Sequence, residues 1–304
     1  MLNLYKLEIF AQVVHAGSFS AAAERLLMTQ SGVSQHIQDL EASLGTQLFE
    51  RGRRGVSLTV SGKKLADYTS QILALVAEAE QAVTNVDALA SGQVHVGTTP
   101  GIGVYRLPSL IQSFHQRYPK LTVELQNSIT SRIVDDLVAG RLDLGFVEGE
   151  LDEATHPHLG IKVLEENEQF VVVGQKHRFW PRQQVTLQEL DGETFIMRQP
   201  NSQTRIWLDQ VLQEAGVRTH IAAEFDNPES IKRTVIMGNA LTILPAYAVQ
   251  DEQTFGVLRL IPLEGKPLVR TLKLIWDKRR FFSPITSSLI THLQACCPML
   301  GDLP

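Results

Sequence analysis

One stretch of thirty residues, 61–90, contains no proline and has its only glycine, Gly62, near its start. Apolar side chains recur along it at alternating steps of three and four: Leu65, Tyr68, Ile72, Leu75, Ala79, Ala82, Val86 and Leu89. This heptad spacing predicts one long helix with an apolar stripe, which needs a partner. The stripe packs either on its own chain or on a second copy, and the heptad period favours a dimer.

The composition is that of a globular protein. The chain has 304 residues, enough for two or three domains of roughly 100–200 residues each. Hydrophobic residues make up 43% and charged residues 20%, which excludes a disordered or collagen-like chain. The only cysteines, Cys296 and Cys297, are adjacent, which indicates a reduced cytosol. No apolar run reaches about 18 residues, and polar residues interrupt the N-terminal apolar stretch, so we expect no membrane partner and a cytoplasmic location.

Net charge is unevenly distributed. The whole chain carries −5, but residues 1–64 hold seven Lys/Arg and five Asp/Glu and are net positive. Their bases gather at the end of the block: Arg51, Arg53, Arg54, Lys63 and Lys64. The whole-chain charge therefore hides a candidate anion-binding module.

Three short helices are predicted at the N-terminus. Residues 4–15 have apolar side chains at helical spacing, and Gly17 ends the pattern. Ser18 or Ser20 can cap a second helix through 21–27. Thr29 stands before a third helix, 30–44, which Gly45 closes. The short link between the second and third helices is typical of a helix-turn-helix.

The third helix has one apolar and one polar face. The polar face is uncharged and consists of Gln30, Ser31, Ser34, Gln35 and Gln38. Gln can pair with adenine, and Ser can donate to or accept from a base edge. The alternative is an ordinary solvated face, but there Lys and Glu usually dominate. The residues favour base reading.

A basic turn and a short strand follow. ERGRRG (50–55) predicts a tight turn and VSLTV (56–60) a strand, which together form a hairpin. Its arginines, Arg51, Arg53 and Arg54, can reach phosphates or the minor groove. A solvated basic loop is the alternative, but the preceding helix-turn-helix favours a DNA-binding wing.

The run FAQVVHAGSFSAAAERLLMTQSGVSQHIQDLEASLGTQLFERGRRGVSLTVSG closely resembles the winged helix-turn-helix of LysR-type transcriptional regulators. The resemblance implies that Gln30, Ser31, Ser34 and Gln35 face DNA, that the three wing arginines contact its backbone or minor groove, and that Thr59 sits at a phosphate. With Ser20, Thr29 and Gln38 they form the candidate DNA-binding set. The family usually has Pro where Ser31 stands and often Arg near Gln35, so the base preference is individual to this chain.

The remaining chain alternates strands and helices. We expect strands at 93–99, 121–126, 143–149, 168–174, 194–198, 220–225, 241–245, 257–263 and 268–277, and helices at 107–118, 131–140, 203–215, 228–238 and 284–297. Strands separated by helices imply a parallel sheet. The segments VGTT, RYPKLTVEL, LVAGRLDLGFV and NALTILPAYAV continue the LysR-type resemblance, which implies a two-lobed effector domain with the periplasmic-binding-protein fold.

The expected architecture is therefore a multidomain α/β protein. Residues 1–60 form the winged helix-turn-helix, 61–90 the dimerising linker helix, and 91–304 the effector-binding domain. By the resemblance, lobe I comprises 91–162 plus 268–304, and lobe II comprises 163–267.

Ligands of such sheets bind beyond the carboxyl ends of strands, where helix N-termini favour anions. Four of these ends are rich in hydroxyls and amides, and they supply the candidate effector residues Thr98, Thr99, Pro100, Ser128, Ile129, Thr130, Gln199, Asn201, Ser202, Thr204, Asp226 and Asn227. We expect a small anionic metabolite as co-inducer and no other cofactor. The alternative is that these residues only cap helices and form turns.

Catalysis is not expected. The sequence has no G-x-S-x-G, H-E-x-x-H or Walker loop. His156 and His158 flank a proline in a loop, a pattern more typical of surface residues than of metal ligands, so no metal site is expected.

We therefore expect a transcriptional regulator that binds double-stranded, roughly palindromic operator DNA. The resemblance implies a tetramer built from dimers, and RNA polymerase is a further candidate partner. The blocks VGTTPGIGVYRLP and FDNPESIKRTV look similar to the subgroup controlling carbon fixation and sulfur assimilation. A solute-binding or transport protein is the competing hypothesis, and the winged module counts against it.

Overall fold

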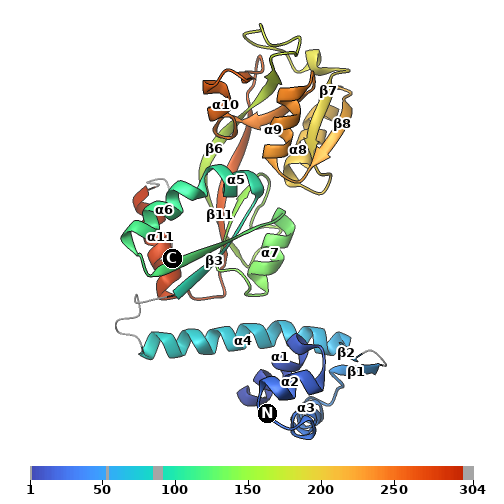
Figure 1. Cartoon of the computed structure of the whole chain (residues 1–304), viewed down its shortest axis with the longest axis vertical. Helices are drawn as coiled ribbons and strands as arrows, with labels where there is room; N and C mark the ends of the chain where they lie inside the picture. The colour runs from blue at the N-terminus through green and yellow to red at the C-terminus, as the bar shows by residue number, and fades with distance from the viewer. Residues whose placement is uncertain (1, 53–54, 85–91, 297–304) are drawn as a thin grey trace. The chain divides into compact units, whose positions relative to one another are not determined.

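The structure is a computed structural model that describes residues 2–52, 55–84 and 92–296, apart from the side chains at 51, 71, 74 and 77–84. It divides into two units, residues 1–88 and 89–304, which Figure 1 shows in one picture.

Three helices, a hairpin and a long helix make up the first unit. They are α1 (Leu4–Ala16), α2 (Phe19–Arg25), α3 (Gln30–Leu44), β1 (Phe49–Gly52), β2 (Gly55–Leu58) and α4 (Val60–Thr84). Gly17 and Gly45 end α1 and α3 with φ of 67° and 65°, a conformation that glycine adopts without strain. Ser18, rather than Ser20, caps α2 by accepting from the backbone of Ala21.

The core of this unit lies between α1, α2 and α3. It contains Ile9, Phe10, Val13, Ala22, Ala23, Val33, Ile37, Leu40, Leu48 and Phe49. Leu65 of α4 packs against it, so the start of the long helix belongs to the same unit. At Gly62 a Cβ would lie 2.0 Å from the carbonyl oxygen of Leu48, and only glycine lets α4 pass so close.

Helix α4 lies where the sequence predicts the linker helix. The expected helix 61–90 corresponds to α4 as far as Thr84. Among the expected stripe residues, Tyr68 and Leu75 are exposed, whereas Leu65 is half-buried. Val86 and Leu89 lie outside the described residues, and so do the side chains of Ala79 and Ala82.

The second unit contains a nine-stranded sheet. Eight strands follow the order β4-β3-β5-β11-β6-β9-β7-β8, and β10 pairs with β6. Their bounds are β3 (Gly92–Thr98), β4 (Leu121–Asn127), β5 (Leu144–Glu148), β6 (Leu159–Gly174), β7 (Thr194–Arg198), β8 (His220–Phe225), β9 (Leu241–Pro245), β10 (Leu258–Ile261) and β11 (Leu268–Asp277). The helices are α5 (Pro100–Tyr105), α6 (Leu107–Arg117), α7 (Thr130–Val138), α8 (Gln203–Glu214), α9 (Pro228–Met237), α10 (Gln250–Thr254) and α11 (Pro284–Cys296), with single 3₁₀ turns η1 (Gln188–Leu190) and η2 (Ala246–Ala248).

Helices cover both faces of the sheet at each end. From here on, lobe I means 92–164 and 272–296 and lobe II means 171–268; these ranges leave out the linking stretches 165–170 and 269–271 and so differ from the expected bounds. In lobe I, α6 and α11 bury one face around Phe114 and Leu289, and α7 buries the other around Ile133. In lobe II, α8 buries one face through Leu208, and α9 buries the opposite face through Ile231. Each lobe is therefore a three-layer sandwich with its own core.

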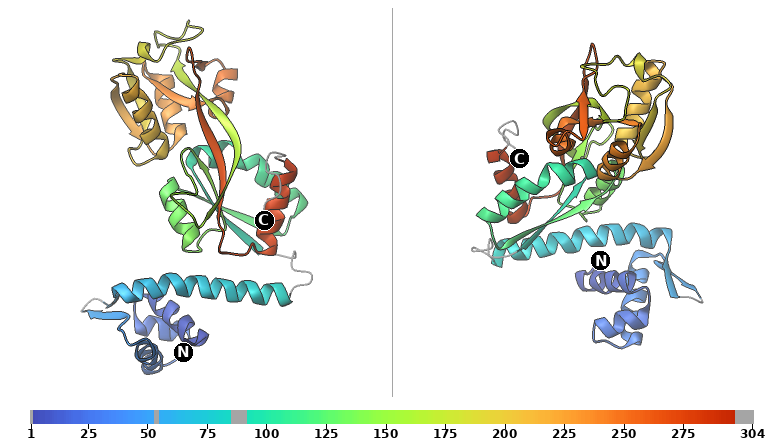
Figure 2. Two further views of the ribbon diagram at one scale, coloured as in Figure 1. Left: turned by 180° about the vertical axis from the view of Figure 1, so that it is seen from behind. Right: turned by 45° about the horizontal axis from the view of Figure 1, so that its top comes forward.

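Two long strands join the lobes. β6 and β11 run antiparallel from one lobe into the other, with their register shifted at Leu272/Lys273, and Figure 2 shows them side by side. The expectation of a parallel sheet is thus wrong at the centre: β3, β4 and β5 are parallel, as are β7, β8 and β9, but β6 and β11 pair antiparallel with their neighbours. The antiparallel centre arises because the chain crosses between lobes twice, in opposite directions.

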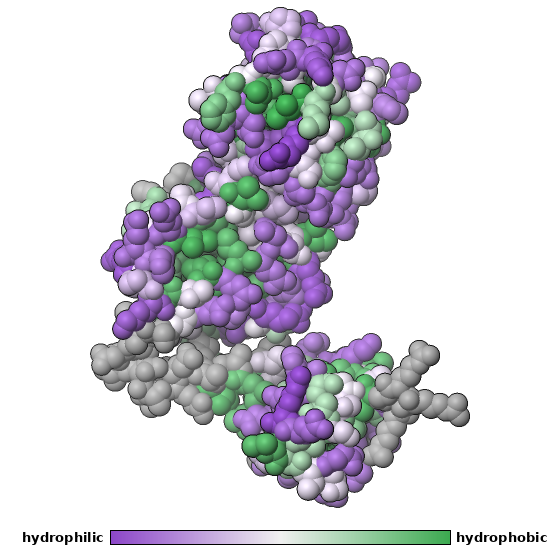
Figure 3. Space-filling model, in the orientation of Figure 1, coloured by the Kyte–Doolittle hydropathy of each residue, from purple (hydrophilic) through white to green (hydrophobic). Residues whose placement is uncertain are grey.

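Polar side chains cover most of the face in Figure 3, with small apolar areas between them. Among the described helices, none is long and apolar enough to cross a membrane.

Candidate functional sites: a helix-turn-helix surface and a pocket between lobes

Helix α3 presents a polar surface in the first unit. Val33, Ile37 and Leu40 point into the core, whereas Gln30, Ser31, Gln35 and Gln38 are exposed and Ser34 is half-buried. Thr29 caps the helix, since its Oγ1 accepts from the backbone of Gly32 at 3.1 Å. Ser20 is exposed on α2. The surface offers uncharged donors and acceptors of the kind that read base edges.

The wing is described only in part. β1 and β2 pair antiparallel, with Arg51 opposite Val56. Arg53, Arg54 and the side chain of Arg51 lie outside the description. The Thr59 hydroxyl donates to the carbonyl of Gln47 at 2.8 Å and accepts from the backbone of Gly62 at 2.9 Å. Thr59 therefore also caps α4, a structural role that the sequence did not reveal.

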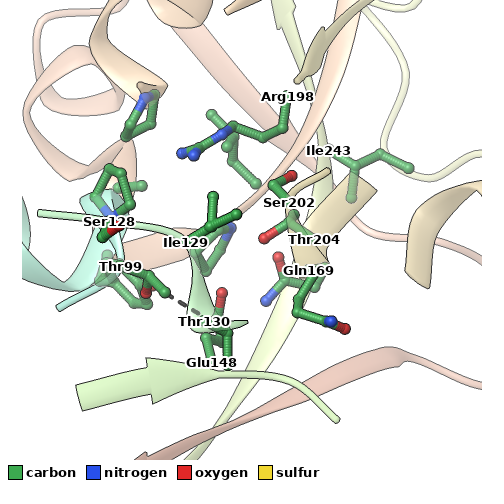
Figure 4. Close-up of a pocket in the computed structure, with 18 residues that line it drawn as sticks. Thr99, Ser128, Ile129, Thr130, Glu148, Gln169, Arg198, Ser202, Thr204 and Ile243 are labelled. Carbon is green, nitrogen blue, oxygen red and sulfur yellow. Dashed lines mark hydrogen bonds between the residues drawn. The ribbon is translucent and has the colours of Figure 1, made fainter. Parts of the chain in front are cut away.

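A pocket lies between the two lobes of the second unit, where the first turns of α5, α7 and α8 meet the central strands (Figure 4). Its lining consists of Thr99, Pro100, Gly101, Ser128, Ile129, Thr130, Glu148, Gln169, Arg198, Ser202, Gln203, Thr204, Pro228, Ile243, Leu244, Pro245, Tyr247 and Ala248. Hydroxyl groups line one part of it and aliphatic side chains another, so the pocket suits a small molecule with both polar and apolar edges.

The structure brings seven of the expected effector residues together here: Thr99, Pro100, Ser128, Ile129, Thr130, Ser202 and Thr204. Five others do not line the pocket: Thr98, Gln199, Asn201, Asp226 and Asn227. Thr98 is buried and donates to the carbonyl of Thr99, and Asn227 caps α9 by accepting from the backbone of Ser230. For these two, the cap or turn role considered from the sequence is the one observed.

The sequence did not predict four side chains of the pocket, the charged Glu148 and Arg198, the amide Gln169 and the aromatic Tyr247. Arg198 ends β7 directly before the candidate Gln199, so extending that turn by one residue into the strand would have found it. Glu148 ends β5, a strand end from which the sequence supplied no candidate. Gln169 lies within β6. It reaches the pocket only because this strand crosses from one lobe to the other.

A buried ion pair lies at the junction of the lobes. Arg270 of β11 donates to the Glu148 carboxylate at 2.9 Å and to the Thr204 hydroxyl at 2.8 Å, so one side chain contacts both lobes. Burial raises the pKa of Glu148, and the positive charge of Arg270 opposes this increase. Burial likewise lowers the pKa of Arg270 and is opposed by Glu148. The two charges compensate each other in a poorly solvated place.

Arg198 differs from Arg270 because it makes no ion pair in the described residues, although the negative charges of Asp226 and Glu148 partly oppose the effect of burial on its pKa. Its Nε is buried and has no hydrogen-bond partner there, and burial lowers its pKa, although Arg remains charged in proteins. In Figure 4 its guanidinium extends across the pocket towards the segment that carries Ser128 and Ile129. The buried Thr130 hydroxyl also has no partner in the described chain. The pocket thus contains a guanidinium nitrogen and a hydroxyl whose hydrogen-bonding capacity is not used by the described chain.

No group of three metal-ligating side chains is found in the described part of the chain. The polar groups of the pocket, mainly hydroxyls and a guanidinium, are ligands for an organic anion and poor ligands for a metal ion.

Two family models match the chain. The model "Bacterial regulatory helix-turn-helix protein, lysR family" matches residues 4–63, and "LysR substrate binding domain" matches 87–297. A probable RuBisCO transcriptional regulator of Emiliania huxleyi is 30% identical over 92% of this chain and 90% of its own length. The transcriptional activator CmpR of Synechocystis is 27% identical over 96% of this chain and 95% of its own.

Solved structures share the fold. A full-length OxyR variant of Pseudomonas aeruginosa aligns with a TM-score of 0.76 at 22% identity, over 100% of this chain and 99% of its own. Full-length CbnR in complex with its target DNA aligns with a TM-score of 0.67 at 22% identity, over 97% of this chain and 99% of its own. The effector-binding domain of QuiR in complex with shikimate aligns with a TM-score of 0.60 at 18% identity, over 68% of this chain and 98% of its own.

The family explains both sites. Its members are transcriptional regulators and not enzymes, which confirms the expectation that this chain is a regulator with a DNA-binding and an effector-binding domain. The resemblance to the carbon-fixation subgroup agrees with the names of the relatives above. This chain belongs to the LysR family of bacterial helix-turn-helix transcriptional regulators.

Proposed function

We propose that this regulator senses a small organic anion in the pocket between its lobes and that Arg198 is the counter-ion. The half-buried Arg198 side chain carries the proposal, because its buried Nε has no hydrogen-bond partner in the described chain and it makes no ion pair there, although the charges of Asp226 and Glu148 favour its ionised form. The N-termini of α7 and α8 start at residues of the same pocket and add partial positive charge.

The hydroxyls and the aliphatic wall narrow the class of effector. Ser128, Thr130 and Ser202 offer hydrogen bonds, whereas Ile129 and Ile243 offer an apolar surface. A compact hydroxylated carboxylate or a similar anion can accept and donate hydrogen bonds at the hydroxyls and also pack its carbon atoms against the apolar surface. The QuiR domain, whose ligand shikimate is such a molecule, supports this choice.

The effector proposal is tested by calorimetry of the full chain against a panel of acids of central metabolism. We expect binding of one acid and an affinity loss of tenfold or more in Arg198→Gln. Arg182→Gln, which changes an exposed arginine of the same lobe, is the matched control. Equal affinity of Arg198→Gln and the parent chain would contradict the proposed counter-ion.

Operator binding is proposed to use the polar face of α3, with the wing arginines and Thr59 near the DNA backbone. Replacing Gln30 by Ala should cost about 1–3 kcal/mol at one operator position if it pairs with a base. A gel shift on DNA flanking the coding region, compared with random DNA, measures this. An equal loss on both would exclude base reading by Gln30.

The proposed assembly is a dimer through α4, and two dimers pair into a tetramer on a roughly palindromic operator. The proposed location is the cytoplasm, and RNA polymerase is a further proposed partner. Residues 1–60, 61–90 and 91–304 would then be the DNA-binding, linker and effector parts. Exposed Tyr68 and Leu75 on α4 support the dimer seam, since apolar side chains there have no cover from their own unit. Sedimentation of Tyr68→Glu should show more monomer than the parent chain, and an unchanged dimer would contradict this seam.

A further inference from the structure

Hydrogen bonds among three polar side chains connect α3 to α1 in the first unit. The Gln35 amide donates through Nε2 to Oδ1 of Asp39 at 2.9 Å, one helical turn further along α3. Lys6 of α1 donates through Nζ to the other carboxylate oxygen, Oδ2, at 3.2 Å. Both oxygens of Asp39 are therefore engaged, one by the exposed polar face and one by the helix behind it.

This arrangement determines which way the Gln35 amide faces. An ionised carboxylate only accepts hydrogen bonds, so Asp39 contacts Nε2 and rejects the carbonyl oxygen of Gln35. The hydrogen bonds from Gln35 and Lys6 also lower the pKa of Asp39, which keeps it ionised at neutral pH. The carbonyl oxygen Oε1 and the second proton of Nε2 remain available to a ligand.

We propose that Asp39, held by Lys6, is a positioning residue that presets the Gln35 amide to favour adenine over guanine in the operator. The inference rests on the proposed function, in which the polar face of α3 enters the major groove. Adenine presents a donor, N6, beside the acceptor N7, whereas guanine presents two acceptors, O6 and N7. An amide that faces the base with its oxygen pairs with the donor of adenine and is repelled by O6 of guanine.

Lys6 has a second effect on DNA binding. A carboxylate on the recognition helix lies near phosphates and repels them unless a cation compensates its charge. Lys6 supplies that charge from α1. Loss of Lys6 should therefore weaken binding to all sequences, whereas loss of the Asp39 carboxylate should change the preference at one base pair.

The test is selection of bound DNA from a random duplex library with the full chain, followed by sequencing. We expect the parent chain to enrich one adenine per half-site that Gln35→Ala no longer enriches. Asp39→Asn offers both a donor and an acceptor, so the Gln35 amide can turn over, and the adenine-to-guanine ratio at that position should fall about fivefold or more. Other positions of the enriched motif should stay unchanged.

The chain offers a matched control on α8. Gln210 donates to Glu214 at 2.8 Å, also four residues apart on an exposed helix face, so Glu214→Gln makes the same chemical change in the other unit of the chain. Its enriched motif should equal that of the parent chain. Asp39→Ala, with thermal unfolding measured beside it, gives a second variant if Asp39→Asn folds poorly.

The outcomes separate this inference from the proposed function. An unchanged adenine-to-guanine ratio in Asp39→Asn and Asp39→Ala would overturn the positioning role, and so would an unchanged motif in Gln35→Ala. In both cases a motif enriched by the parent chain would leave operator binding intact. Failure of the parent chain to enrich any sequence would instead overturn the proposed DNA reading by α3, and this inference with it.

Discussion

The hydroxyl of Tyr105, at the end of α5 in lobe I, donates a hydrogen bond to the carboxylate of Glu229 at the start of α9 in lobe II. The Lys232 ammonium lies 2.9 Å from the same carboxylate and 4.7 Å from the centre of the Tyr105 ring. Because α5 begins at pocket residue Pro100 and ends at this contact, the same short helix contributes to the pocket and to the contact between the lobes.

Tyr105→Phe should loosen the contact between lobes. Burial raises the pKa of Tyr105 above its ordinary value, so the hydroxyl stays a donor at neutral pH. Its loss removes a hydrogen bond to a charged group that is partly exposed, so we expect a decrease of about 1 kcal/mol in the free energy of unfolding of the second unit. Urea unfolding measures this, and amide exchange in α5 and α9 should quicken. Tyr118→Phe, whose ring packs on Phe114, serves as control; unchanged exchange in Tyr105→Phe would contradict the coupling.

Breaking the ion pair between Arg270 and Glu148 should be far more costly. Their side chains are 1% and 10% exposed, so Glu148→Gln leaves a buried charge without its partner. We expect a loss of about 3–5 kcal/mol in the free energy of unfolding. The double variant Glu148→Leu/Arg270→Met should recover much of this loss, since neither charge remains. A single variant as stable as the parent chain would show that solvent reaches the pair.

Stability at acid pH should depend on Asp277. Burial opposes its ionisation, but hydrogen bonds from the Arg279 side chain and backbone outweigh this, so the pKa of Asp277 lies below its ordinary value of 3.8. A lowered pKa in the folded state means that the carboxylate stabilises the fold above the unfolded-state pKa, and this contribution is lost as pH falls through the folded-state value. The parent chain should therefore exceed Asp277→Asn in stability at pH 7, and the difference should shrink at more acid pH than about 4. Thermal unfolding across pH checks this, with the exposed Asp135→Asn as control; a constant difference would contradict it.

Leu27 holds an unfavourable backbone conformation in the turn before α3. Its φ is 54°, and its side chain is 94% exposed, so no burial compensates the strain. Asn tolerates this conformation better, and Leu27→Asn should raise the free energy of unfolding of the first unit by up to about 1 kcal/mol. Denaturant unfolding is the measurement. Leu44→Asn, at the helical end of α3, should not stabilise; if both variants behave alike, strain at Leu27 is not the cause.

Local chemistry determined much of the fold. The bounds of β7, β8, β9 and β11 match those expected from the sequence, because each is an apolar or β-branched run between turn residues. Thr29 and Gly45 likewise delimit α3 where their capping roles predict. Such signals act between neighbouring residues, so they can be recognised in the local sequence without knowledge of the rest of the fold.

β6 and α5 show where local signals fail. The first part of β6, 159–167, was not expected because Glu165 and Glu166 give it a polar sequence. It is a strand because β11 pairs along its length. α5 begins in the glycine-rich segment after Thr99, where no helix was expected. In both places tertiary pairing outweighs local preference.

The sequence by itself determined the helix-turn-helix, most strands and the hydroxyl-bearing turns of the pocket. Only the tertiary structure decided that Arg198, Glu148, Gln169 and Tyr247 share that pocket and that Asp39 connects Gln35 to Lys6. The physical reason is distance along the chain: caps and periodicity act within a few residues, whereas a pocket and its charges arise only when strands and helices far apart in sequence pack together.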